Sequence, residues 1–298
     1  MGCRDRVAVD RPGRQPRVSR PAEQVNKPVK KIALVANSDK PAARRIVQRA
    51  ARLAAAAGMK PVIDEAKAHS ADLVMVFGGD GTMLHWARDM AGSGTPIFGV
   101  NIGGMGFLTA VSGKDLANAI RSIAAREFSI ETRTLLSARG ESNGAPFRLS
   151  AMNDIVISRG TVPRMIRVEV KVDGEVLTIY RCDGLVVGTP TGSTAYSLAA
   201  GGAIVAPGAG VFSITPVCPH TLSNRAVIVS QQSTIEVRML DRQREATLAA
   251  DGSDVVELAA DSPVTIRRSR CTVKLARLPG SSFFQTLRQK LQWTGSHA

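Results

Sequence analysis

Hydrophobic residues follow two different periodicities along this chain. Between residues 30 and 127, short apolar runs alternate with segments in which apolar residues recur at helical spacing. The run 72–77 (Asp-Leu-Val-Met-Val-Phe) is almost continuously apolar, as is typical of parallel strands that are covered on both faces. This alternation predicts an α/β domain with an open parallel sheet over residues 30–127. Strands are expected at 31–36, 61–63, 72–77 and 96–100, and helices at 41–57, 82–90 and 114–126.

From residue 128 onward, apolar and polar residues alternate with a period of two, which is typical of antiparallel strands. The segments with this pattern are 128–138, 147–158, 165–172, 175–180, 184–188, 226–230, 233–239, 245–250 and 264–275. Asp173-Gly174 separates two of them and is a strong hairpin signal. Many short strands without intervening helices predict an all-β, β-sandwich-like domain over residues 128–276.

The two ends of the chain lie outside these two predicted domains. Residues 277–298 return to helical spacing, and their apolar stripe predicts a C-terminal helix that packs back onto one of the domains; the stripe is Phe283, Phe284, Leu287, Leu291 and Trp293. Residues 1–29 hold four prolines, seven basic and three acidic residues, and no apolar run. This composition predicts a disordered basic tail and is unlike a secretory signal.

Composition narrows the classes of function. The 298 residues carry a net charge of +14, which favours anionic partners, but only 4% are aromatic, which disfavours stacking on nucleic-acid bases. No run reaches the roughly 18 uncharged apolar residues that a membrane helix needs. The four cysteines and four histidines are dispersed without metal-ligand spacing. We therefore expect a cytoplasmic protein that binds neither nucleic acid nor membrane and has no metal centre of its own.

The strongest local motif is Gly78-Gly79-Asp80-Gly81, which lies where a buried strand gives way to a helix. Glycines at this position let backbone N–H groups approach a phosphate closely, and the helix N-terminus adds a favourable field. A carboxylate is not needed to hold phosphate, so Asp80 suggests a proton acceptor or a cation ligand. The alternative is that Asp80 only caps the helix. A Walker-type loop is absent, and Leu84 occupies the third glycine position of a G-x-G-x-x-G motif.

Further polar motifs follow other predicted strands. A second glycine-rich segment, 99–108, follows the next strand of the α/β domain, which implies a shared crevice or else a flexible connection. In the β-rich domain, Asn153-Asp154 interrupts the alternation, and segment 189–197 contains five Ser or Thr residues together with Tyr196. Hydroxyl groups and an aromatic ring suit a polar ligand with a flat ring, or simply a turn. No His or Lys lies near these serines, which disfavours a serine hydrolase.

In combination, these motifs resemble the NAD kinase family. The resemblance covers residues 73–108, 152–160, 181–207, 216–229 and 278–295, in the family's order and spacing. The Gly-Gly-Asp-Gly loop alone is shared with diacylglycerol and sphingosine kinases, whereas the combination is highly specific. This sequence departs from the family's pattern at Asp154, where many members have Glu, at Ala203, where Pro is common, and after Asp251-Gly252, where Gln often follows.

The resemblance implies an α/β domain, a β-rich domain and a ligand cleft between them. It also implies transfer of the ATP γ-phosphoryl group to the 2′-hydroxyl of the adenosine ribose of NAD, which gives NADP. Asp80 is then the candidate general base, and a divalent cation, Mg²⁺, is expected to arrive with ATP. The implied NAD contacts are Asp80, Gly81, His85, Asn153, Asp154, Arg164, Arg181, Asp183, Thr194, Ala195, Tyr196, Ser197, Leu198, Ala199 and Ser253. Members of the family tend to form homodimers or homotetramers.

Three other functions fit parts of the sequence. A lipid kinase would share the phosphate loop, but it would need a membrane-binding surface, and only the C-terminal stripe suggests one. A regulator that binds a dinucleotide without catalysis would not need a carboxylate beside the phosphate loop. A nucleic-acid binder is supported by net charge alone.

Overall fold

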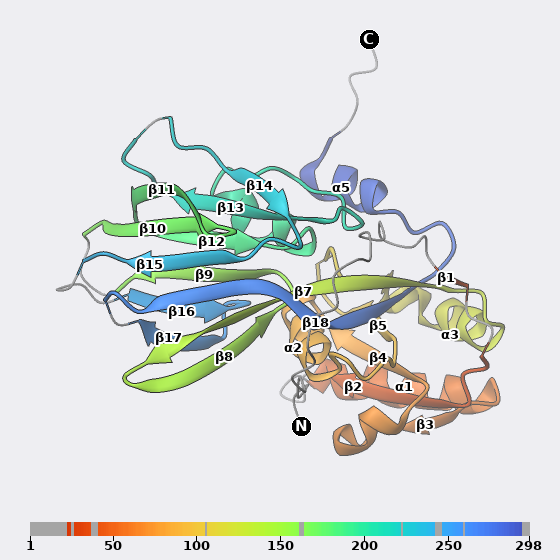
Figure 1. Cartoon of the computed structure of the whole chain (residues 1–298). Helices are drawn as coiled ribbons and strands as arrows, with labels where there is room; N and C mark the ends of the chain where they lie inside the picture. Colours follow the sequence, from red (N-terminus) through yellow and green to blue (C-terminus); the bar gives the residue numbers. More distant parts are fainter. Residues whose placement is uncertain are drawn as a thin grey trace, which may run out of the picture. The chain divides into compact units, whose positions relative to one another are not determined.

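The computed structural model describes residues 23–24, 27–36, 41–104, 106–160, 164–221, 223–241, 246–258 and 260–293. These residues form two compact units (Figure 1). The first unit contains the described residues up to Arg133 and those from Thr272 onward, and the second contains those from Thr134 to Cys271. The strands β7 (Ser129–Ser142) and β18 (Pro263–Arg277) are long, and each contributes residues to both units.

The first unit is built on a parallel sheet. Its strand order is β3-β2-β4-β5-β18, and every neighbouring pair in this order is parallel. The strands are β2 (Lys31–Ala36), β3 (Lys60–Val62), β4 (Leu73–Gly78) and β5 (Ile97–Asn101), followed by the last residues of β18, where Leu275 pairs with Ile97. Two short strands join it: β6 (Val111–Ser112) pairs with β5, and β1 (Glu23–Gln24) pairs with β7. The predicted open parallel α/β fold is confirmed.

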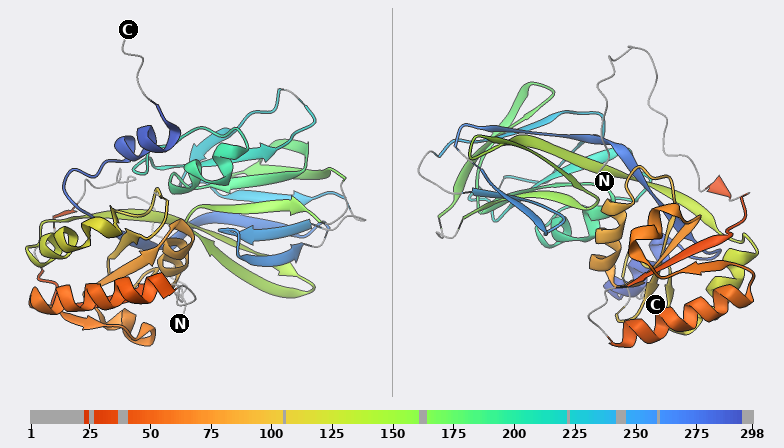
Figure 2. Two further views of the ribbon diagram at one scale, coloured as in Figure 1. Left: turned by 180° about the vertical axis from the view of Figure 1, so that it is seen from behind. Right: turned by 90° about the horizontal axis from the view of Figure 1, so that it is seen from below.

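Helices cover both faces of this sheet (Figure 2). Helices α1 (Pro41–Ala56) and α3 (Leu116–Ala124) share one hydrophobic cluster with alternate residues of the strands, such as Leu34, Met75 and Phe98. Helix α2 (Asp80–Asp89) packs on the other face, where a side chain on Gly99 would lie 2.8 Å from Met83 Sδ. Two 3₁₀ turns, η1 (Glu65–Ser70) and η2 (Gly113–Asp115), complete the connections.

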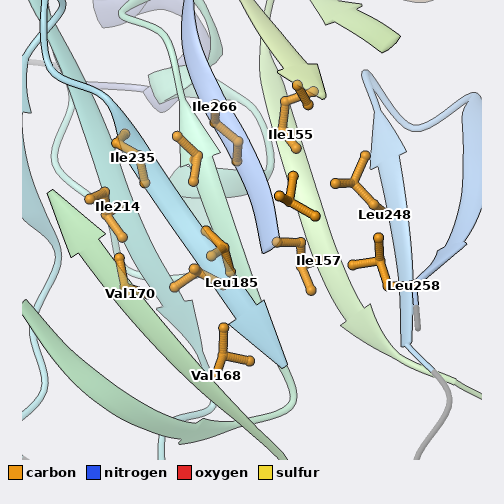
Figure 3. Close-up of a cluster of buried hydrophobic side chains, with 14 of the residues drawn as sticks. Ile155, Ile157, Val168, Val170, Leu185, Ile214, Ile235, Leu248, Leu258 and Ile266 are labelled. Carbon is orange, nitrogen blue, oxygen red and sulfur yellow. The ribbon is translucent and has the colours of Figure 1, made fainter. Parts of the chain in front are cut away.

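The second unit consists of two antiparallel sheets. One is six-stranded, with the order β14-β13-β12-β9-β16-β17. The other is the antiparallel part of a twelve-stranded sheet, with the order β11-β10-β15-β18 and with β7 and β8 attached to it. The remaining strands are β8 (Ala145–Ala151), β9 (Asp154–Arg159), β10 (Ile166–Val172), β11 (Glu175–Cys182), β12 (Gly184–Gly188), β13 (Val211–Val217), β14 (Val227–Ser230), β15 (Ile235–Met239), β16 (Ala246–Ala250) and β17 (Asp254–Leu258). Figure 3 shows branched side chains from both sheets, including Ile155, Leu185 and Ile235, gathered into one core. The β-sandwich-like prediction is confirmed.

The hairpin predicted at Asp173-Gly174 is confirmed. Val172 pairs with Glu175, and the two residues between them have φ angles of 52° and 87°. Positive φ at both central positions is the type I′ geometry that matches the twist of paired strands.

Other expectations are corrected by the structure. The segment 147–158 is two strands rather than one, because the chain passes from one sheet to the other at Met152–Asn153. The tail was predicted to be disordered to residue 29, but Glu23–Gln24 form a strand, Lys27 pairs with Asp72 and Val29 is buried. The rest of the tail, residues 1–22 and 25–26, lies outside the described residues. Strands β13 and β17 were not predicted.

The C-terminal helix α5 (Phe283–Leu291) packs back as expected through Leu287, which is buried. Lys290 Nζ lies 5.8 Å from the centre of the Phe107 ring. Phe284 and Trp293 belong to the predicted stripe but are exposed, so the stripe is only partly a core element. No described helix is both long and apolar enough to cross a membrane. Cys182 and Cys218 carry free thiols.

Candidate active site

Asp80 is the first residue of α2, directly after the strand β4 and the N-cap residue Gly79. Its carboxylate turns away from the helix and binds the second glycine-rich loop. Oδ2 accepts the backbone N–H of Phe107 at 2.8 Å, and Oδ1 accepts that of Leu108 at 3.0 Å. The N-cap position is occupied by Gly79 and not by Asp80. The alternative in which Asp80 only caps the helix is therefore wrong.

Glycines let this carboxylate approach the loop and leave space around it. A Cβ on Gly106 would collide with the Asp80 carboxylate, so only glycine permits this contact. A Cβ on Gly79, Gly81, Gly103 or Gly104 would meet no atom within 4 Å. The backbone of both loops is therefore accessible at the carboxyl ends of β4 and β5, where α/β sheets bind ligands. Such amides can hold an anion.

A second aspartate has a similar role in the β-rich unit, and sequence reasoning missed it. Asp251 accepts the backbone N–H groups of Met152, Asn153 and Asp154 at 2.9, 2.7 and 3.2 Å, and its own N–H donates to the Asp154 carbonyl at 3.0 Å. These bonds hold the chain where it passes from β8 to β9. The only signal in the sequence was Asp251-Gly252 after a strand, and the φ of 49° at Asp251 marks the turn.

Asp154 is only 4% exposed and lies close to Asp251. Burial, together with the negative charge of Asp251, raises the pKa of Asp154 to about 7. The carboxyl group therefore gains a proton near neutral pH. In that state it can donate a hydrogen bond as well as accept one.

The hydroxyl-rich segment 189–197 is largely bonded within its own unit. Thr189 Oγ1 donates to the Met152 carbonyl at 2.6 Å, Ser193 Oγ donates to the Val205 carbonyl at 3.1 Å, and Ser197 Oγ lies 3.2 Å from Thr215 Oγ1. The Thr189 N–H also donates to the Asn153 carbonyl at 2.8 Å. The structure thus brings this segment together with Asn153 and Asp154.

The outward-facing member of the segment is Tyr196, which is 45% exposed. Its ring is available to a ligand, whereas the buried Ser197 hydroxyl is occupied by Thr215. Next along the chain, Leu198 is half-buried and Ala199 is exposed. Thr194 and Ala195, which precede the tyrosine, are half-buried.

The remaining predicted contacts lie at separate places on the two units. His85 is exposed on α2, with its ring edge-on to Trp86. Arg164, Arg181 and Ser253 are exposed in the β-rich unit. Asp183 forms an ion pair with Arg159, whose Nε lies 3.1 Å from Asp183 Oδ1, and not with the neighbouring Arg181. Sequence reasoning did not identify Arg159. Contact of these residues with NAD stays a prediction.

The structure also contains hollows away from these residues. One, of about 320 Å³, is lined by residues of β2 and α1 such as Leu34, Arg44 and Val47, and another, of about 220 Å³, by residues such as Glu169, Lys171 and Arg238. Neither is lined by a predicted site residue. Among the residues that the structure describes, no three His, Cys, Asp or Glu side chains gather in a group that could hold a metal ion.

Comparison with known proteins connects these observations to a family. Residues 59–128 match the ATP-NAD kinase N-terminal domain, and residues 152–278 match the ATP-NAD kinase C-terminal domain. The NAD kinase of Symbiobacterium thermophilum is 39% identical over 281 residues, which cover 89% of this chain and 99% of the relative. The chain belongs to the NAD kinase family.

Other members of the family support this assignment. The NAD kinase of Syntrophotalea carbinolica is 43% identical over 224 residues, covering 74% of this chain and 78% of the relative. The crystal structure of the Archaeoglobus fulgidus NAD kinase in complex with ATP has a TM-score of 0.72 at 26% identity, over 89% of this chain and all of that one (100%). Yeast NADH kinase, crystallised with NADH, has the same fold, with a TM-score of 0.81 at 22% identity over 92% of this chain and 90% of that one.

Proposed function

We propose that this protein transfers the γ-phosphoryl group of ATP to the 2′-hydroxyl of the adenosine ribose of NAD and so forms NADP, with Asp80 as the general base. The observation that carries this assignment is the Asp80 carboxylate, fixed by two loop amides at the carboxyl end of β4 and surrounded by accessible glycine backbone. Family membership supplies the substrates. NADH kinase and the ATP complex, named above, support a dinucleotide acceptor and ATP as donor.

The chemistry requires a positioned alcohol and a proton acceptor. As the bond between the ribose oxygen and the γ-phosphorus forms, the bond from that phosphorus to the β–γ bridging oxygen breaks, and ADP leaves. The hydroxyl proton passes to Asp80. Each Asp80 oxygen accepts one amide N–H, and a carboxylate oxygen has a second lone pair available for that proton. The amides fix the carboxylate in place, which is how a positioned base gains its rate advantage.

The other parts of the site are proposed on the same basis. Asn153, Asp154, Asp183 and Tyr196 are among the candidate NAD contacts given in the sequence analysis, with Tyr196 offering an exposed ring. Mg²⁺ would be held by the phosphates of ATP and by water, and it would neutralise the charge that develops on the transferred group. A homodimer or homotetramer and a cytoplasmic location complete the proposal.

The direct test incubates the full-length protein with ATP and Mg²⁺ together with either NAD or diacylglycerol, and separates the products by chromatography. We expect NADP and ADP in equal amounts from NAD, with no phosphorylated lipid. Mixtures without ATP, or with a chelator in excess over Mg²⁺, are the controls and should give no NADP. Phosphorylated lipid without NADP would favour the lipid kinase, and bound NAD without turnover would favour the regulator.

A further inference from the structure

An arginine at the end of β18 binds the same loop as Asp80. Arg277 Nη1 donates to the carbonyl oxygens of Leu108 and Thr109 at 3.3 and 3.2 Å, and Nη2 donates to that of Phe107 at 3.3 Å. The side chain is 13% exposed. Arg277 belongs to the first unit, as do Asp80 and the loop.

Asp80 and Arg277 hold complementary groups of the same two residues. Asp80 accepts the N–H groups of Phe107 and Leu108, and Arg277 donates to their carbonyl groups. A guanidinium group presents several donors in a rigid plane, so it can serve three neighbouring carbonyls at once. Lysine carries the charge but lacks this fork. The position of the loop amides that fix Asp80 is therefore set by Arg277.

A half-buried acidic partner, Glu131, orients Arg277 in turn. Arg277 Nε lies 3.4 Å from Glu131 Oε2, and the same Glu131 oxygen is bound by Arg133. Burial alone would raise the pKa of Glu131, but the charges of Arg133 and Arg277 outweigh burial and hold that pKa below its ordinary value. Glu131 is thus a stable anion that fixes the guanidinium group against the loop.

We infer that Arg277 is a positioning residue for phosphoryl transfer, which holds the Phe107–Leu108 segment so that its amides keep the Asp80 carboxylate in place. Arg277 acts through the loop and contacts none of the reacting groups. This role rests on the proposed function of Asp80, and the contacts themselves do not depend on it.

The test compares Arg277→Gln and Arg277→Lys with wild type, and uses Arg268→Gln as the matched control. Arg268 lies on the same strand and is exposed. We expect kcat for NADP formation to fall about 10- to 100-fold in Arg277→Gln, with the KM for NAD within about threefold of wild type, because a misplaced catalytic group slows the chemical step. Arg277→Lys should recover part of the loss, and Arg268→Gln should match wild type.

Hydrogen exchange provides a readout that is independent of activity. In Arg277→Gln, the amides of Phe107 and Leu108 should exchange faster than in wild type, while amides in the core of β4 keep their protection. Unchanged exchange at these two amides, or a kcat within threefold of wild type, overturns the role of Arg277 even if Asp80→Asn is inactive. If wild type makes no NADP, the proposed function fails, and faster exchange would still support the loop contact. If Arg277→Gln does not fold, hydrogen exchange at Phe107 and Leu108 and the kcat for NADP formation are measured in Arg277→Lys instead. Faster exchange with a lower kcat than in wild type would support the role of Arg277, and unchanged values would overturn it.

Discussion

Asp80 in the first unit and Asp251 in the second each hold a distant loop by accepting its backbone N–H groups. Asp80 accepts two, from Phe107 and Leu108, and Asp251 accepts three, from Met152, Asn153 and Asp154. Charge-assisted bonds of this kind are stronger than bonds between neutral groups. The contacts are alike, and the surroundings of the two carboxylates differ.

Around Asp80 lie the start of a helix and accessible glycine backbone, both of which favour anions. Beside Asp251 lies a second, buried carboxyl group, and the repulsion between the two makes the ionised form of Asp154 unfavourable. The first arrangement leaves a carboxylate ready to act on a ligand, whereas the second uses one to fix a turn. The number of amide contacts therefore does not distinguish the two aspartates, and it is their neighbouring groups that favour Asp80 as the proposed base.

The largest effect should come from Asp80→Asn. We expect turnover to fall about 10²–10⁴-fold, or about 3–5 kcal/mol of barrier, because the amide cannot accept the hydroxyl proton. Steady-state NADP formation measures the loss, and circular dichroism should show a retained fold. Asp89→Asn, at the other end of α2, is the matched control. Turnover within threefold of wild type would show that Asp80 is not the base. The proposed difference in role between Asp80 and Asp251 would then no longer hold.

Asp154→Asn should remove a dependence of stability on pH. Asp154 stays protonated in the folded protein up to about pH 7, whereas in the unfolded chain it ionises near its ordinary pKa of 3.8. Between these values the folded state binds more protons, so the free energy of unfolding of wild type falls as the pH rises. The variant should therefore gain about 3 kcal/mol over wild type from pH 5 to pH 8. Denaturant unfolding at both pH values measures this, and a difference that does not change with pH would contradict it.

Asp251→Asn should lower the free energy of unfolding by about 2 kcal/mol, since a charged acceptor of three N–H groups becomes a neutral one. Asparagine tolerates the left-handed backbone at this position, so the loss reports on the hydrogen bonds. Urea unfolding midpoints provide the measurement, with Asp254→Asn, at the exposed start of β17, as control. A variant of normal stability whose kcat had fallen 100-fold would assign Asp251 to the chemistry instead.

The smallest effect is expected for Gly106→Ala. The new methyl group would occupy the place of the Asp80 carboxylate, and we expect kcat to fall about tenfold as that carboxylate shifts. Gly103→Ala changes the same loop where a Cβ meets no atom within 4 Å. Equal losses in both variants would show that the loop itself, rather than the placement of Asp80, limits turnover.

Much of the fold could be predicted from the periodicity of hydrophobic residues. The elements that this periodicity missed were missed for physical reasons. The parallel strands are apolar runs because both of their faces are covered, and Asp173-Gly174 marks its hairpin because both residues adopt positive φ. Strand β13 was missed because it contains Pro216 and buries Ser213 and Thr215, which conceals the alternation. At the passage between sheets, Asn153-Asp154 interrupts the alternation, but two polar residues fit a ligand contact as well as a break between strands, so the pattern alone did not divide the segment.

The site was predictable only in part, for a related reason. Asp80 follows from its glycine motif at the end of a strand. Its partners at Phe107 and Leu108, and the contacts of Arg277 and Asp251, run through backbone N–H and C=O groups, which every residue except proline carries. Such contacts between distant segments leave no residue pattern in the sequence, so they become visible only in the folded structure.

The position of β18 in the chain has a consequence for biosynthesis. Leu275, which pairs with β5, and Arg277, which binds the loop, are translated only after the whole of the second unit. A nascent chain that has just emerged to residue 271 therefore contains Asp80 and its loop without the arginine that binds this loop. On the ribosome, the first unit becomes complete only when the end of β18 has been translated, so the proposed catalytic arrangement can form only after both units have been synthesised.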